Sequence, residues 1–93
     1  MAIMEIKFDR NLTSLTAAQN ELLFYISNKI ITRPEIKLQL IANEEKTEEI
    51  VQKRLETVSD KLKILGISSY RIDRLVVKEK AASEGVIKLV FFE

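Results

Sequence analysis

The chain has 93 residues, of which 46% are hydrophobic and 31% charged, so it is long enough for one compact domain and too short for two ordinary ones. Its formal net charge of +1 favours neither a strongly basic nucleic-acid binder nor an acidic tail. The absence of Cys and His excludes thiolate chemistry, His general bases and the common zinc and haem sites. We therefore predict one non-catalytic domain over residues 1–93, with no cofactor, metal ion or small-molecule substrate.

The N-terminal segment predicts a short strand. Residues 3–8 alternate in polarity, which places Met4, Ile6 and Phe8 on the inner face. The segment lacks the long apolar run of a signal peptide, and the longest apolar run of the chain, Leu22–Ile26, is too short to span a membrane. The expected location is therefore the cytoplasm, with no membrane association.

Two helices are predicted next. Thr16-Ala-Ala-Gln19 has the pattern of a capping box, and the first helix is expected over Leu15–Ile30. Thr32-Arg-Pro-Glu35 also resembles a helix start, because Thr is a good N-cap and Pro is tolerated in the first turn. This pattern predicts a second, short helix over Thr32–Leu40.

The remaining segments predict a long helix and a hairpin. A third helix is expected over Glu45–Leu65, ended by Gly66 in a left-handed conformation. Tyr70–Glu79 and Val86–Phe92 are rich in β-branched residues and are expected to pair as a β-hairpin. The resulting fold class is α+β: a winged helix-turn-helix with three helices, a C-terminal β-hairpin wing and a short N-terminal strand.

A local excess of positive charge favours contact with a DNA backbone. Residues 50–80 contain eight basic and four acidic side chains. The acidic residues at the start of the third helix are better explained by the helix dipole than by function. The candidate DNA-contacting residues are Lys53, Arg54, Arg71, Arg74, Lys78, Lys80 and Lys88. Solubility alone explains such a basic surface about equally well.

The apolar surface of the chain suggests self-association. The third helix has an apolar stripe that consists of Val51, Leu55, Val58, Leu62 and Leu65. Such a stripe is typical of the side of a helix that faces the core, and a short coiled-coil seam is the less favoured interpretation. Elsewhere the chain has more large apolar side chains than a small monomer needs to bury. The candidate homodimer interface consists of Leu23, Phe24, Tyr25, Phe91 and Phe92.

Two stretches resemble the N-terminal winged-helix domain of plasmid replication initiators. LTSLT at residues 12–16, followed by QNELLFYISNKI at residues 19–30, resembles the opening of that family over about one quarter of the chain. The segment 85–92 resembles the strand that follows its wing. The resemblance implies a domain that dimerises and contacts the DNA backbone at a replication origin. It assigns Arg71, Arg74, Lys78 and Lys80 to the wing, and Leu23, Phe24 and Phe91 to dimer packing.

The expected function is thus that of a cytoplasmic, non-catalytic winged-helix protein that binds the backbone of double-stranded DNA as a homodimer in plasmid replication. The alternative is a winged-helix protein-interaction module without a nucleic-acid role. Its contact surfaces would be the acidic turn at residues 44–49 and the apolar C-terminal strand.

Overall fold

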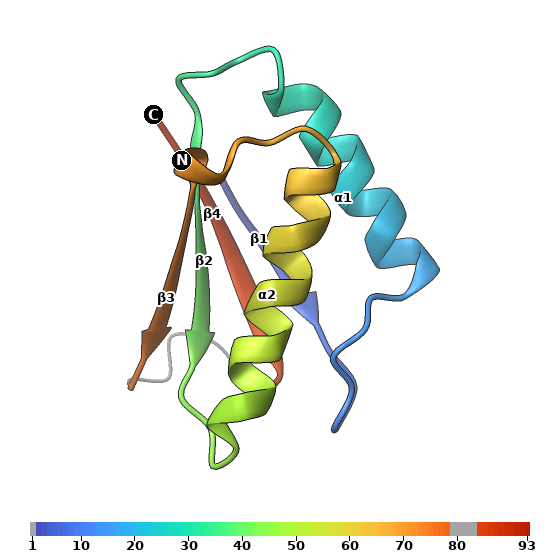
Figure 1. The fold of residues 1–93 in the computed structure, drawn as a ribbon, viewed down its shortest axis with the longest axis vertical. Coiled ribbons are helices and arrows are strands. Elements are labelled where there is room, and N and C mark those ends of the chain that lie inside the picture. Colours follow the sequence, from blue (N-terminus) through green and yellow to red (C-terminus); the bar gives the residue numbers. More distant parts are fainter. Residues whose placement is uncertain (1, 79–83) are drawn as a thin grey trace.

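The computed structural model describes residues 2–78 and 84–93, which form a sheet covered by helices (Figure 1). The elements follow one another as β1 (Ala2–Lys7), α1 (Ala17–Ile30), β2 (Lys37–Asn43), α2 (Glu48–Ile64), a 3₁₀ turn η1 (Ser69–Arg71), β3 (Ile72–Val77) and β4 (Val86–Phe92). No helix in the described part of the chain is long and apolar enough to cross a membrane.

The four strands form a mixed sheet in the order β1-β4-β2-β3. β4 lies between β1 and β2 and is antiparallel to both, whereas β2 and β3 are parallel. β1, β2 and β3 therefore run in the same direction, and their C-terminal ends reach the same edge of the sheet, together with the start of β4 (Figure 1). Segments from four separate parts of the sequence thus meet at one end of the molecule.

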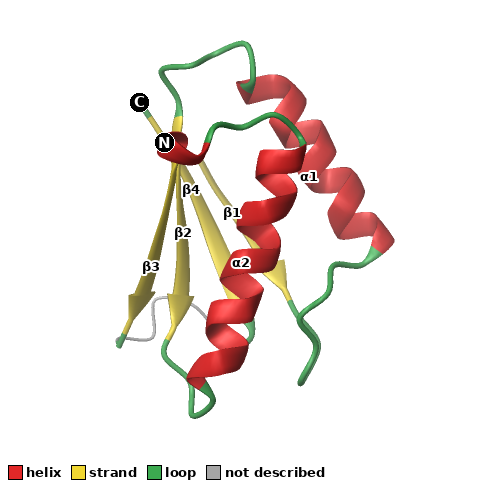
Figure 2. Ribbon diagram, viewed as in Figure 1, coloured by secondary structure: helices red, strands yellow, loops and turns green. Residues whose placement is uncertain are grey.

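Both helices cover the same face of the sheet (Figure 2). Side chains alternate along each strand, so that Leu89 lies between Met4 and Leu40 in one row of this covered face. The buried core consists of Ile6, Phe8, Leu23, Ile30, Leu38, Leu40, Ala42, Val51, Leu55, Val58, Leu62, Ile67, Ile72, Ile87 and Leu89. The apolar stripe of α2 belongs to this core, which confirms the favoured interpretation of that stripe.

The predicted signals at the start of α1 and at the end of α2 are confirmed. Thr16 caps α1: its hydroxyl accepts from the Gln19 amide, and the Gln19 side chain accepts from the Thr16 amide, at 3.1 and 3.0 Å. α2 ends just before Gly66, whose φ of 103° lies in the left-handed region. The N-terminal strand is also confirmed, since Ile6 and Phe8 are buried and Met4 packs against the core.

The short helix predicted over Thr32–Leu40 is wrong. Pro34 lies in a turn, and residues 37–43 form β2, in which Leu38, Leu40 and Ala42 are buried in alternation. The local start signal was misleading because the position of β2 between β3 and β4 outweighs it, as tertiary context commonly does for short segments. The described residues therefore contain two α-helices.

The predicted C-terminal hairpin is also wrong, although both of its strands exist. β3 pairs in parallel with β2, with Leu38 opposite Ile72, whereas β4 pairs with β1 and β2. Two strands that follow one another in sequence are thus separated in the sheet by β2. The winged-helix fold class is therefore corrected to an α/β fold with two helices on a four-stranded mixed sheet.

Candidate ligand-binding groove

A groove of about 1140 Å³ opens at the edge of the sheet where the four strand ends meet. Its walls come from the segment after β1, the loop between β2 and α2, the first turns of α2, the end of β3 and the start of β4. The lining residues are Lys7, Phe8, Asp9, Arg10, Asn11, Asn43, Glu44, Glu45, Lys46, Thr47, Ile50, Arg54, Lys78, Glu84 and Gly85.

The rim of this groove carries charges of both signs. Lys7, Arg10, Lys46 and Lys78 are exposed basic residues of the lining, which also includes three exposed acidic residues. The acidic residues are Asp9, Glu44 and Glu84. Such a groove suits a ligand that has both carboxylate and amino groups, because each sign of charge finds a partner there.

A buried ion pair lies at the base of the groove. Arg54 Nη1 is 3.3 Å from Glu45 Oε2, and the side chains of these residues are 4% and 17% exposed. The rest of the guanidinium group donates to backbone carbonyls, with Nε 2.9 Å from Leu12 O and Nη2 3.3 Å from Asp9 O. All three nitrogens of this arginine are therefore engaged inside the protein, as a buried guanidinium requires.

The carboxylate of Glu45 connects this arginine to the sheet. Glu45 Oε2 also accepts from the Gly85 amide at 3.1 Å, and the Gly85 carbonyl accepts from the Phe8 amide at 2.8 Å. Gly85 has a φ of 80°, and a Cβ there would lie 3.0 Å from the carbonyl oxygen of Phe8. A side chain at this position is therefore disfavoured by both the backbone conformation and the space.

The groove offers charged and polar groups to a bound molecule. The described residues include no group of three or more acidic side chains that could hold a metal ion. The sequence also supplies neither His nor Cys as a base or nucleophile beside the groove. Its polar groups are instead suited to ion pairs and hydrogen bonds with a bound molecule.

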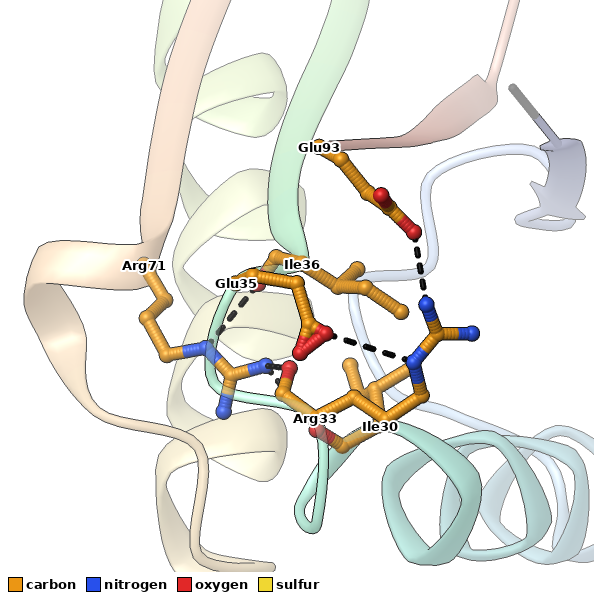
Figure 3. Close-up of polar contacts among 6 residues, drawn as sticks. All are labelled: Ile30, Arg33, Glu35, Ile36, Arg71 and Glu93. Carbon is orange, nitrogen blue, oxygen red and sulfur yellow. Dashed lines mark hydrogen bonds and ion pairs between the residues drawn. The ribbon is translucent and has the colours of Figure 1, made fainter.

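Arg71, a candidate DNA contact, is buried at the opposite end of the sheet. Arg71 is 4% exposed, and its guanidinium group donates to the carbonyls of Ile30, Arg33 and Ile36 at 2.8 to 3.0 Å (Figure 3). The neighbouring Arg33 forms ion pairs with Glu35 and Glu93 at 3.3 and 2.7 Å. Arg71 thus fixes the segment between α1 and β2 instead of facing outward.

The other predicted DNA-contacting residues do not share one surface. Lys53 is exposed on α2, and Lys78 is exposed at the end of β3, on the rim of the groove. Arg74 pairs with Leu40 and so lies on the helix-covered side of the sheet, whereas the half-buried Lys88 lies opposite Glu5 on the uncovered side. Lys80 falls outside the described residues.

The predicted dimer interface is dispersed in the same way. Leu23 is fully buried in the core, whereas Phe24 and Tyr25 on the same helix are 54% and 58% exposed. Phe91 is partly buried against the core, and its neighbour Phe92 lies on the opposite face of the sheet. The five residues do not form a continuous surface.

Sequence reasoning missed the groove because it treated Glu45 as one of several acids at a helix start. A usable signal was present in α2. Arg54 lies three residues after Val51 and four before Val58, so it falls within the apolar stripe. An arginine in that position is expected to be buried and to need a partner.

No family model and no curated protein sequence matches this chain. Its fold is similar to that of the peptidoglycan-associated lipoprotein from Burkholderia pseudomallei, with a TM-score of 0.79 and 17% identity over 95% of this chain and 89% of that chain. The C-terminal domain of Helicobacter pylori MotB gives 0.78 and 12%, over 99% and 86%. The OmpA-like domain of FopA1 from Francisella tularensis gives 0.67 and 17%, over 96% and 71%.

These similarities correct the identification drawn from sequence. The resemblance to plasmid replication initiators is wrong, and the winged-helix alternative is wrong with it, because the fold is a different one. The predictions of double-stranded DNA and a second copy of the chain as partners depended on that fold and are wrong with it. The predicted cytoplasmic location is also wrong on these findings. The similar structures include the periplasmic domain of H. pylori MotB and an outer membrane protein from Borrelia burgdorferi. The chain has the α/β fold of OmpA-like domains.

Proposed function

We propose that this chain is a non-catalytic domain that binds peptidoglycan in the cell envelope. The observation that carries the proposal is the similarity to the peptidoglycan-associated lipoprotein over 95% of the chain, at a TM-score of 0.79. The match extends over nine tenths of that protein as well, so it concerns a whole domain and not one supersecondary unit.

The groove at the strand ends is the proposed binding site. Peptidoglycan carries short peptides that have both carboxylates and free amino groups, and the groove presents exposed side chains of both signs. Arg10 and Lys46 come from two different walls of the groove and provide cations for ligand carboxylates. Asp9, Glu44 and Glu84 provide carboxylates for ligand amino groups.

Co-sedimentation with purified peptidoglycan sacculi tests this proposal. We expect the wild-type chain to sediment with the sacculi, and the bound fraction to fall as the salt concentration rises, because the contacts are charged. The double variant Arg10→Glu with Lys46→Glu should bind about tenfold more weakly, which corresponds to about 1.4 kcal/mol.

The control is Lys53→Glu, which reverses one exposed charge on α2 outside the groove. This variant should bind within about twofold of wild type, because surface charges away from a site contribute little. Failure of the wild-type chain to sediment with sacculi at low salt would contradict peptidoglycan binding. Equal weakening by the double variant and by Lys53→Glu would contradict the location of the site.

A further inference from the structure

β3 is an outer strand of the sheet, and its free edge carries open backbone groups (Figure 1). The Glu44 amide donates to the Val77 carbonyl at 2.8 Å, so Val77 directs its polar backbone groups toward β2. Successive residues of a strand direct these groups to opposite sides, and the N–H and C=O groups of Arg74 and Val76 therefore point outward. The part of the chain that the structure describes offers no hydrogen-bond partner to these four groups.

The other outer strand, β1, has a more closed edge. The Phe8 amide bonds to the Gly85 carbonyl at the start of β4, so the preceding residue, Lys7, directs its backbone groups to the outer side. There the Lys7 carbonyl accepts from the side chain of Gln19 on α1 at 2.7 Å. β3 lies at the opposite margin of the sheet from β1. It is therefore the more accessible of the two edges.

The side chains beside the open groups of β3 differ between the two faces of the sheet. Arg74 lies on the helix-covered face and is nevertheless exposed. On the uncovered face, Leu75 is 41% exposed and Val77 is half-buried. The exposed Asp73 also lies on this uncovered face. A strand added at this edge would meet a cation on one face and an apolar pair on the other.

We propose that the free edge of β3 is a docking site for an extended segment of a partner protein, which adds to the sheet as a further strand. Its backbone exchanges hydrogen bonds with Arg74 and Val76, which supplies affinity for any extended segment. The side chains select the sequence: an acidic residue opposite Arg74, and apolar residues opposite residues 75–77. β3 lies outside the lining of the groove, so the inference is independent of the proposed peptidoglycan binding.

Charge decides which kind of strand can occupy this edge. A charged side chain on an edge strand discourages pairing with a purely apolar strand, and an acid opposite Arg74 removes that penalty. A second copy of β3 does not supply such an acid. The side chains of β3 on the helix-covered face are Ile72, Arg74 and Val76, and edge-to-edge pairing of two copies brings like faces together. The occupant is therefore an acidic and apolar segment of a different protein.

The probe is the blocked peptide Ile-Val-Ile-Glu-Lys-Thr, titrated into the ¹⁵N-labelled full chain. In antiparallel alignment its glutamate faces Arg74 and its valine faces Val76. We expect saturable shifts of the amides of residues 72–77, while residues 7–11 in the groove stay unchanged. Absence of shifts at millimolar peptide, or shifts confined to the groove, would overturn the docking site.

Methylation of peptide nitrogens tests whether the peptide binds as a strand. N-methyl groups on the valine and the glutamate remove the two N–H donors that face β3, and should weaken binding about tenfold. The matched control carries its N-methyl groups on the second isoleucine and the lysine, whose N–H groups point away from β3. It should bind within about twofold of the unmodified peptide. Equal weakening by the two modified peptides would overturn strand addition.

Exchange of charges tests the role of Arg74. The chain should bind the glutamate peptide about fivefold more tightly than Ile-Val-Ile-Lys-Lys-Thr, and the variant Arg74→Glu should reverse this preference. The control Lys53→Glu, on the exposed side of α2, should keep the wild-type preference. An unchanged preference in Arg74→Glu would overturn the acidic character of the partner. Concentration-dependent broadening of amides 72–77 without peptide would identify a second copy as the occupant and would also overturn the proposal.

Discussion

At the scale of single residues, the structure depends on two buried arginines at opposite ends of the sheet. A buried guanidinium is tolerated only when its N–H groups are satisfied, and each of these arginines bonds to backbone carbonyls in the turns and loops that join the helices and strands or at the end of a helix. Arg54 has a carboxylate partner in Glu45. Arg71 bonds to three backbone carbonyls of the segment between α1 and β2.

The change Arg71→Met should lower the free energy of unfolding by about 2 to 4 kcal/mol. It removes three charged hydrogen bonds from the segment between α1 and β2, while the side-chain volume is roughly retained. Urea unfolding followed by circular dichroism measures this effect. The control is Arg74→Met on the neighbouring strand, where the side chain is exposed and the expected change is below about 0.5 kcal/mol. Similar values for the two variants would contradict a structural role for Arg71.

Which residues fill the candidate site was only partly predictable. From the sequence, Arg54 is placed on the surface as a candidate DNA contact, because the sequence alone shows no partner for a buried arginine. That partner, Glu45, lies nine residues away in the loop before α2, and the carbonyls of Asp9 and Leu12 lie more than forty residues away. Such contacts exist only once β1 and β2 are placed on either side of β4.

At the scale of elements, the two helices begin with different local contacts. α1 begins at a capping box in which the side chains of Thr16 and Gln19 bond to each other's backbone, and the side-chain nitrogen Nε2 of Gln19 also donates to the Lys7 carbonyl at 2.7 Å. α2 begins after Thr47, whose side chain makes no capping hydrogen bond. The same residue type thus occupies two N-caps with different contacts.

The change Thr16→Ala should therefore destabilise the fold more than Thr47→Ala. Loss of a side-chain cap costs about 1 kcal/mol, so we expect that value at Thr16 and a few tenths of a kcal/mol at Thr47. Thermal or urea unfolding of the two variants beside wild type measures the difference. Equal effects at the two positions would show that the hydrogen bonds of the Thr16 hydroxyl contribute nothing to stability.

The difference between local signals and long-range pairing explains how much of the fold could be predicted from the sequence. α1, α2, β1 and the two C-terminal strands were identified because periodicity, caps and Gly66 are local signals. β2 was mistaken for a helix because Thr32 and Pro34 imitate a helix start. The pairing of β3 with β2 was missed because it joins segments more than thirty residues apart, and no feature of either strand specifies its neighbour.

At the scale of the whole molecule, function depends on the topology of the sheet. β1, β2 and β3 run in one direction, so the segments that follow them gather at one edge, where the start of β4 joins them. A winged helix built from the same segments would have separated these residues. The change of fold therefore also moves the proposed binding site, from a basic wing to a groove with charges of both signs.

The most direct test of this account is a chemical-shift titration of the ¹⁵N-labelled chain with soluble muropeptides. We expect the perturbed amides to fall in residues 7–11, 43–47 and 84–85, around the groove, and the amides of η1 and of the surroundings of Arg71 to stay unchanged. No perturbation at millimolar muropeptide, or perturbations concentrated at the Arg71 end of the sheet, would contradict it.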